Sequence, residues 1–146
     1  MSAAPHIFTL TGNLLAERTL EFATWTPGKT QRAKSESFQV GGKGINVSKM
    51  LNRLGAPNTA LFFPGGAAGT EAEAWLRARN FSCRPFGTTT PTRTGTVVRG
   101  GGHGETTFLA PDTPPDPAAI RAGADFVNAQ PGGVLAICGS LPGWDT

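Results

Sequence analysis

A glycine-rich segment, VGGKGINVS at residues 40–48, carries the groups in this sequence that are best suited to bind a small polar ligand. Glycines let a ligand approach the main chain because they have no Cβ. The segment leads into a helical pattern, so its backbone N–H groups include the unpaired donors of a helix N-terminus. Asn46 adds an amide that both donates and accepts, as the adjacent hydroxyls of a sugar require. The alternative is a tight strand-to-helix turn that binds nothing.

Two common phosphate-binding motifs do not fit this segment. A Walker A loop requires a lysine followed by serine or threonine, whereas Lys43 is followed by Gly44. A dinucleotide-binding fingerprint that began at Gly42 would need a glycine where Val47 stands, and no acidic ribose ligand is evident. The segment therefore differs from the usual nucleotide-binding loops.

Three stretches carry the signals of amphipathic helices. The first, residues 44–54, ends before Gly55 and has apolar residues at i, i+3, i+4 and i+7: Val47, Met50, Leu51 and Leu54. The second opens on a capping box of Thr70 and Glu73. It is expected to bury Ala72, Trp75 and Leu76. The third runs from the N-cap Asp116 and Pro117 to about residue 127. Its expected inner face consists of Ile120, Ala124 and Val127.

The remaining apolar stretches predict strands at residues 7–11, 59–63, 81–86, 94–99, 106–109 and 134–138. The last of these, VLAIC, is apolar without alternation, which is typical of a parallel strand covered on both faces. Helices that alternate with such strands predict an α/β sandwich with a mostly parallel sheet. Two further strands, 19–25 and 36–40, flank a turn at Pro27, Gly28 and Lys29 and predict a hairpin apart from the main core.

Composition restricts the function classes. The 146 residues suffice for one domain, and a content of 38% hydrophobic and 16% charged residues is typical of a soluble globular chain. The net charge of +3 is spread without a basic run, which argues against nucleic acid and leaves anionic small molecules as partners. No secretory signal or membrane-length apolar run is visible. Cys83 and Cys138 form no CxxC pair, and a buried, reduced Cys138 would indicate a cytoplasmic protein.

Small residues and one asparagine recur at a characteristic spacing: Gly41, Gly42, Gly44, Asn46, Ser48, Gly55 and Gly65. This spacing resembles the first signature of the ribokinase-like carbohydrate kinases of the phosphofructokinase-B type. Residues 92–94 (TRT) and 139–142 (GSLP) resemble two further segments of that family. In appearance the chain is nearest to the branch of 1-phosphofructokinases and tagatose-6-phosphate kinases. The resemblance implies a ribokinase-like three-layer α/β sandwich with a mostly parallel sheet, plus a small β lid at about residues 17–40.

The resemblance also implies a sugar-binding site. In the family the glycine loop and its asparagine hold the sugar, and the matching residues here are Gly42, Gly44 and Asn46. Glu17 stands where the family has an aspartate that binds sugar hydroxyls. The extra methylene of Glu17 moves its carboxylate by roughly a bond length, enough to disturb a well-placed hydrogen bond. A solvated loop carboxylate is the alternative role for Glu17.

Three more residues match positions that contact the substrate. Lys29 and Arg93 match those that bind the substrate phosphate in sugar-phosphate members; an arginine fork can hold two phosphate oxygens at once, and a lysine acts as a point charge. Ser140 follows the strand at residues 134–138, and ligands bind outside the carboxyl ends of strands in open α/β sheets. The alternatives are ordinary solvated charges and a hydroxyl that completes a turn.

The chain has no counterpart of the Gly-Ala-Gly-Asp-like segment in which the family carries its catalytic aspartate. We therefore expect residues 1–146 to be the N-terminal, substrate-binding part of an ATP-dependent sugar or sugar-phosphate kinase, truncated before the C-terminal nucleotide-binding part. The chain then has no catalytic residue, and the implied cofactors, ATP and Mg²⁺, bind outside it. The isolated chain is predicted to be inactive. A homodimer through the lid strands is also implied.

Other classes of function remain open from the sequence. One is a non-catalytic sugar-binding or interaction module derived from such a kinase, with Glu17 as a first sign of drift. Another is a purely structural α/β domain whose glycines match by coincidence. The sequence identifies neither the sugar nor the hydroxyl that is phosphorylated.

Overall fold

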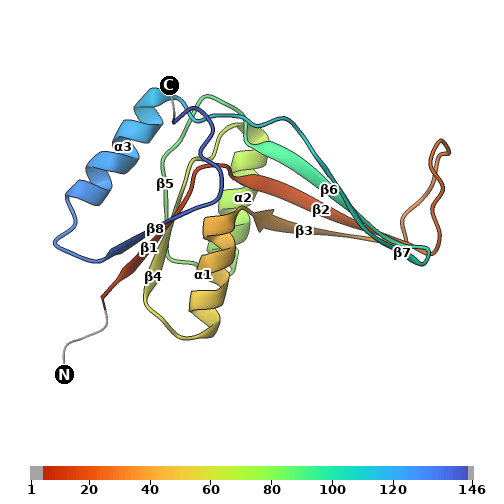
Figure 1. Cartoon of the computed structure of the whole chain (residues 1–146), viewed down its shortest axis with the longest axis horizontal. Helices are drawn as coiled ribbons and strands as arrows, with labels where there is room; N and C mark the ends of the chain where they lie inside the picture. Colours follow the sequence, from red (N-terminus) through yellow and green to blue (C-terminus); the bar gives the residue numbers. More distant parts are fainter. Residues whose placement is uncertain (1–4, 145–146) are drawn as a thin grey trace.

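The computed structural model describes residues 5–144, in two sheets and three helices (Figure 1). The first sheet has the strand order β5-β4-β1-β8, and every neighbouring pair in it is parallel. Its strands are β1 (Ile7–Thr11), β4 (Asn58–Phe62), β5 (Cys83–Pro85) and β8 (Val134–Cys138). Helices α1 (Lys43–Arg53) and α2 (Gly66–Ala78) cover one face, and α3 (Pro117–Asn128) covers the other (Figure 1). The predicted three-layer α/β architecture is therefore confirmed.

Two hydrophobic clusters occupy the two faces of this sheet. Because side chains alternate along a strand, Phe62 of β4 packs with Ile45 of α1 and Leu76 of α2, whereas its neighbour Leu61 packs with Ala119 of α3. All of these side chains are buried. The clusters hold β1 and β4 at fixed positions, so the segments that follow these strands are positioned rigidly.

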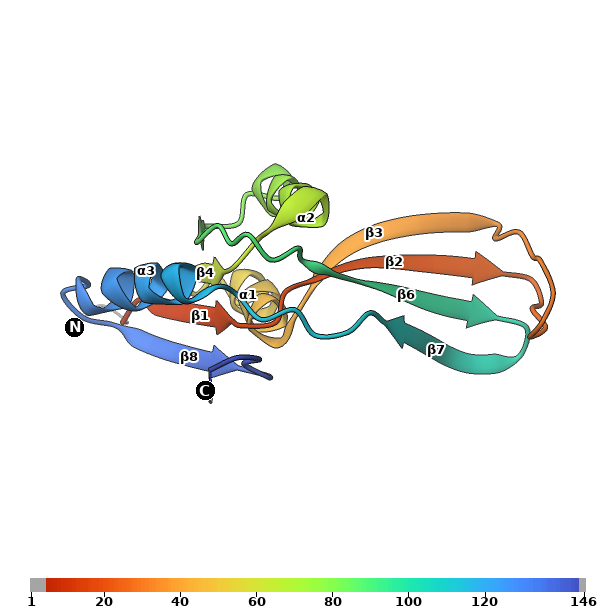
Figure 2. The same ribbon diagram turned by 90° about the horizontal axis from the view of Figure 1, so that it is seen from above.

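The second sheet, which forms the lid, extends away from the first (Figure 2). Its order is β3-β2-β6-β7, with β2 (Leu15–Phe22), β3 (Ser35–Gly41), β6 (Arg93–Gly100) and β7 (His103–Leu109). The predicted hairpin is confirmed as the antiparallel pair of β2 and β3, although β2 begins four residues before the expected residue 19. The predicted strands at residues 94–99 and 106–109, whose position the sequence did not indicate, complete this lid, because β6 pairs with β2 in parallel and β7 pairs with β6.

Side chains of both the lid and α2 hold the two together. The indole Nε1 of Trp75 donates to the Phe38 carbonyl oxygen at 3.0 Å. The Arg18 guanidinium contacts both carboxylate oxygens of Glu71, at 2.8 and 3.0 Å. These contacts hold one face of the lid against α2. The opposite face, which carries Glu17 and Gln39, lies at the end of the first sheet.

The buried face of α1 differs from the predicted one. Met50 and Leu54 of the predicted stripe are 50% and 72% exposed, whereas Gly44, Ile45 and Ser48 are buried. Gly44 lets the helix approach the Leu10 backbone, and the Ser48 hydroxyl bonds to that of Thr9 at 2.6 Å. Close backbone approach and a buried hydrogen bond, rather than apolar periodicity, therefore orient this helix.

The predicted start of α2 is also wrong. The helix begins at Gly66 with Gly65 as its N-cap, so Thr70 and Glu73 lie inside it. The Thr70 hydroxyl donates to the Gly66 carbonyl oxygen, and Glu73 pairs with Arg77 one turn later. Ala72 and Leu76 are buried as predicted, and Trp75 is half-buried.

The predicted start of α3 is confirmed, and its predicted inner face is partly right, since Val127 packs against the core cluster on this face of the sheet. Asp116 is the N-cap and Pro117 follows it. Ala119 and Gly123 are buried, whereas Ala124 is exposed. A Cβ at Gly123 would lie 3.4 Å from the Phe63 ring, an ordinary contact distance, so Gly123 packs directly against the aromatic side chains of this face.

Strand β8 is less covered than its apolar sequence predicts. Leu135 and Ile137 share the face of α3 and are 37% and 55% exposed. In the described part of the chain β8 pairs with β1 alone, and α3 packs on β1 and β4 rather than on β8. Cys138 is accordingly only half-buried, which corrects the expectation of a buried thiol.

The N-cap of α3 predicts a measurable pH dependence. The Asp116 carboxylate accepts hydrogen bonds from the backbone N–H groups of Thr89 and Ala119 and from the Thr88 hydroxyl, which lower its pKa from 3.8 to about 2. A lowered pKa stabilises the fold above the ordinary carboxyl pKa, and this contribution is lost as the pH falls toward 2. We expect wild type to exceed Asp116→Asn in free energy of unfolding at neutral pH, and this difference to shrink below about pH 4. Urea unfolding at several pH values measures this difference in free energy of unfolding. A difference that does not change with pH would contradict the lowered pKa of Asp116.

Candidate functional site

A cleft of about 320 Å³ lies between the carboxyl ends of β1 and β8, the start of α1 and the base of the lid. Its lining residues are Thr11, Asn13, Leu15, Glu17, Gln39, Gly41, Gly42, Lys43, Asn46, Arg93, Thr107, Leu109, Cys138, Gly139 and Ser140. Ligands of open α/β sheets bind at this end of the strands. The cleft therefore has the position expected of a binding site.

The glycine loop shapes the floor of the cleft. Gly42 is the N-cap of α1 with a φ of 115°, a conformation that favours glycine, and a Cβ there would lie 2.5 Å from the Thr11 methyl group. No side chain of the described residues caps α1, so the N–H groups of its first turn face the cleft without a side-chain acceptor. Gly44 lies just below the loop, buried against the Leu10 backbone, and does not line the cleft.

A hydrogen-bond network holds the carboxylate side of the cleft. Gln39 donates to Glu17 at 2.5 Å, so the longer side chain of Glu17 is fixed by a residue of the neighbouring strand. Lys49 of α1 donates to the Val40 carbonyl at 2.7 Å and lies 3.4 Å from Gln39 Oε1 and Asn46 Oδ1. Burial lowers the pKa of Lys49. Glu17 and Asn46 are thus connected through Gln39 and Lys49.

The opposite side of the cleft is organised around Asn13. Its Nδ2 donates to Asp112 Oδ1 and to Ser140 Oγ, both at 2.9 Å. Arg93, whose side chain is 13% exposed, donates through Nη1 to the same Asp112 oxygen at 3.1 Å. Arg93 and Ser140, which are far apart in the sequence, therefore meet through two intervening side chains.

The structure brings together five of the seven residues predicted for the site: Glu17, Gly42, Asn46, Arg93 and Ser140. Gly44 supports the loop from below. Lys29 is exposed in the loop that joins β2 and β3, at the end of the lid farthest from the first sheet (Figure 2), and it does not line the cleft. In this chain Lys29 and Arg93 are therefore not brought together.

Other cleft residues were missed from the sequence. Lys43 lies at the start of α1, is exposed, and forms no ion pair with any described residue. Its place inside the glycine loop, before Gly44, was the available signal in the sequence. Gln39 and Asn13 of the cleft, and Asp112 beside it, gave no local signal, because their contacts join strands or loops far apart in the chain.

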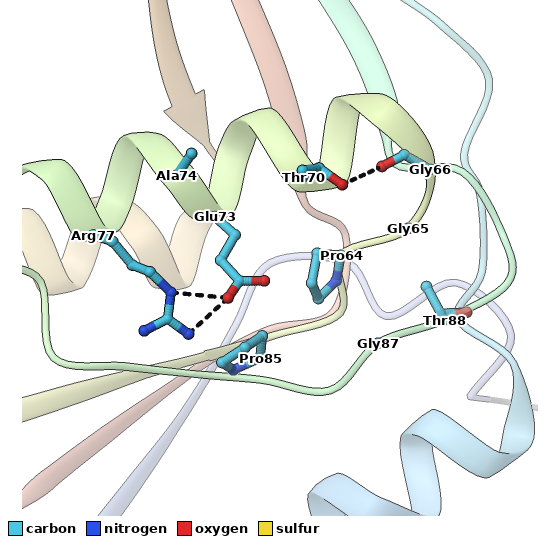
Figure 3. A pocket seen from close by; sticks show the side chains of 10 residues that line it. All are labelled: Pro64, Gly65, Gly66, Thr70, Glu73, Ala74, Arg77, Pro85, Gly87 and Thr88. Carbon is cyan, nitrogen blue, oxygen red and sulfur yellow. Dashed lines mark hydrogen bonds and ion pairs between the residues drawn. The ribbon is translucent and has the colours of Figure 1, made fainter.

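A larger hollow of about 490 Å³ lies between α2 and residues 85–88 (Figure 3). Its charged side chains, Glu73 and Arg77, face each other, and Arg77 Nε donates to Glu73 Oε1 at 2.9 Å. They neutralise each other, and none of the predicted site residues is present. Chemistry rather than size therefore favours the smaller cleft.

Residues 5–144 contain no group of three or more His, Cys, Asp or Glu side chains that could hold a metal ion. Within the same range no helix has both the length and the apolar character needed to cross a membrane.

The family follows from the sequence of nearly the whole described chain. The model of the family described as pfkB family carbohydrate kinase matches residues 11–143. The chain belongs to the pfkB family of carbohydrate kinases. The family resemblance predicted from the glycine, threonine-arginine and serine-proline segments is thereby confirmed.

Three proteins similar to this chain are sugar-phosphate kinases by name. The chain is 44% identical over 63 residues to D-tagatose-1-phosphate kinase of Bacillus licheniformis, covering 43% of this chain and 21% of that protein. It is 29% identical over 136 residues to 1-phosphofructokinase of Bacillus subtilis, covering 93% and 45%. The structure of Escherichia coli phosphofructokinase-2 in complex with fructose-6-phosphate matches with a TM-score of 0.80 at 25% identity, covering 97% and 47%. The chain thus spans less than half the length of these relatives, and its ribokinase-like fold is confirmed.

Proposed function

We propose that the cleft binds a sugar phosphate, and that the chain is the substrate-binding part of an ATP-dependent kinase that phosphorylates a hydroxyl of a hexose phosphate. The observation that carries this proposal is the convergence of Lys43, Arg93 and Asn46 on one cleft at the N-terminus of a helix. Cationic side chains and helix N–H groups bind phosphate, and an amide binds sugar hydroxyls.

The two sides of the cleft suit the two ends of such a ligand. Glu17, held by Gln39, accepts hydrogen bonds from sugar hydroxyls, and Asn46 can donate to a hydroxyl oxygen. Arg93 and Lys43 supply positive charge for the phosphate, one as a fork and the other as a point charge. The E. coli relative that forms a complex with fructose-6-phosphate supports a hexose phosphate as the ligand class.

The phosphoryl-transfer step needs a general base and a bound nucleotide. Asp112 is engaged by Asn13 and Arg93, and Asp116 caps α3, so neither carboxylate is available to accept a hydroxyl proton. We assign the base, ATP and Mg²⁺ to residues outside this chain, in the part of the relatives that it does not cover. The lid strands, closing over the sugar and pairing two copies as a homodimer, belong to the same proposal.

Binding of a sugar phosphate is the first test. Calorimetry of the purified chain should detect fructose 6-phosphate or fructose 1-phosphate, and Asn46→Ala should weaken binding by roughly tenfold, as expected for one or two lost hydrogen bonds. Asn128→Ala, at the exposed end of α3, is the matched control and should bind like wild type. A folded wild-type sample that binds neither sugar phosphate would refute the proposal.

The second expectation concerns turnover. The isolated chain should release no ADP from ATP in the presence of a hexose phosphate, because Asp112 and Asp116 are both engaged and we assign the base and the nucleotide site to residues outside this chain. A coupled assay for ADP measures this, with a full-length pfkB kinase as the positive control. Sustained turnover by the pure chain would show that a catalytic group has been overlooked.

The alternative is a non-catalytic sugar-binding module. The glutamate at position 17, where the family has aspartate, favours it, since the carboxylate here is engaged by Gln39. Adding a polypeptide that carries the missing half of a pfkB kinase separates the two functions. Restored turnover supports the kinase part, and tight sugar binding without turnover supports the module.

A further inference from the structure

Asp112 occupies a short proline-rich segment between β7 and α3, PDTPPD at residues 111–116. The segment is anchored at both ends: the Ala110 N–H donates to the Thr94 carbonyl at 2.9 Å, and the Asp116 N–H donates to the Thr88 hydroxyl at 2.9 Å. Its three prolines restrict the backbone further, because each ring fixes φ. Asp112, whose side chain is 54% exposed and does not itself line the cleft, therefore lies in a constrained loop beside it.

One oxygen of this carboxylate joins two residues that line the cleft. Oδ1 accepts from Asn13 Nδ2 at 2.9 Å and from Arg93 Nη1 at 3.1 Å. Asn13 Nδ2 also donates to Ser140 Oγ. The cluster thus links the segments after β1, β7 and β8 to the first residue of β6.

The hydrogen-bonding chemistry of these groups lets Asp112 determine how the side-chain amide of Asn13 is oriented. A carboxylate only accepts, whereas the amide of Asn13 has a donor end and an acceptor end that differ little in shape. Asp112 therefore selects the orientation in which the Asn13 nitrogen faces the cluster. Within the described residues, Asn13 Oδ1 and Arg93 Nε are buried without a hydrogen-bond partner, which costs desolvation free energy. The hydrogen bonds to Asp112 must therefore offset this cost to keep both side chains in place.

We propose that Asp112 is a positioning residue of the cleft, which fixes the amide of Asn13 and the guanidinium of Arg93 for the ligand. This inference rests on the proposed binding of a sugar phosphate. Asp112 also offsets the charge of Arg93, so its charge and its hydrogen bonds act on an anionic ligand in opposite directions. A test must separate the two effects.

Two substitutions of Asp112 make that separation. Asp112→Asn and Asp112→Ala remove the same charge, but only asparagine keeps an oxygen that can accept from Asn13 and Arg93. By calorimetry with fructose 6-phosphate, Asp112→Asn should bind at least as tightly as wild type. Asp112→Ala should bind roughly tenfold more weakly than Asp112→Asn, as expected for two lost hydrogen bonds. The pair Asp125→Asn and Asp125→Ala, on the exposed side of α3, should show no such difference.

A measurement without ligand keeps this inference separate from the proposed function. In nuclear magnetic resonance spectra of the ligand-free chain, the side-chain amide protons of Asn13, assigned with Asn13→Ala, should exchange slowly in wild type and Asp112→Asn and rapidly in Asp112→Ala. Unchanged exchange in Asp112→Ala, or equal affinities of the two Asp112 variants, would overturn the positioning role. If wild type binds no sugar phosphate, the proposed function fails, and the exchange rates still decide whether Asp112 orients Asn13.

Discussion

Gly44→Ala is expected to destabilise the chain by about 3 kcal/mol, at the upper end of the cost of overpacking. A Cβ at this position would collide with the Thr11 hydroxyl and lie 2.7 Å from the Leu10 carbonyl oxygen. The collision involves the backbone of β1, which cannot move without disturbing the central strand of the first sheet. The gain in helix propensity from alanine, about 1 kcal/mol, is smaller than this cost.

The effect of Gly44→Ala should extend to the cleft. Because α1 begins one residue before Gly44, displacement of the helix moves the loop of Gly42 and the side chain of Asn46. Urea unfolding measures the stability and calorimetry the affinity for fructose 6-phosphate. Gly87→Ala is the matched control, since a Cβ there meets nothing within 4 Å and should leave both quantities nearly unchanged. Equal stability of the Gly44 and Gly87 variants would contradict the packing described for α1.

Arg93→Ala should weaken the binding of a sugar phosphate by about 2 kcal/mol, which is roughly 30-fold, the usual loss for a charge-assisted hydrogen bond. Arg93 is largely buried at the first residue of β6 and is held there by Asp112. Its removal takes away the guanidinium and leaves the Asp112 carboxylate uncompensated beside the cleft. Both changes disfavour a dianionic phosphate.

A comparison of ligands isolates the phosphate. Calorimetry with fructose and with fructose 6-phosphate should show the large loss only for the phosphate ester, because the substitution leaves Glu17 and Asn46, the proposed sugar-binding residues, in the cleft. Arg121→Ala, an exposed arginine of α3, removes the same charge away from the cleft and is the control. Equal losses for the two sugars would mean that Arg93 maintains the shape of the cleft rather than binding phosphate.

The sequence predicted those features that depend on local chemistry. The N-cap of Asp116 with Pro117, the C′ role of Gly55 (φ 67°) and strands β1 and β8 are confirmed, because each is specified by a few neighbouring residues. The glycine loop and its spacing, together with residues 92–94 and 139–142, were sufficient to identify the family, since close approach to the main chain restricts the residue types at consecutive positions. Five of the seven site residues expected from the family resemblance line one cleft.

Tertiary structure alone decided which surfaces meet. The apolar stripe of Val47, Met50 and Leu54 predicted the wrong face of α1, because periodicity does not contain the buried Thr9–Ser48 hydrogen bond or the contact of Gly44 with β1. The pairing of β6 with β2 completed the lid, and parallel pairing of strands so distant in the chain leaves no local pattern. The glycine loop was thus determined by the sequence itself, whereas only the fold brought Gln39 and Asn13 to the same cleft and Asp112 to Asn13.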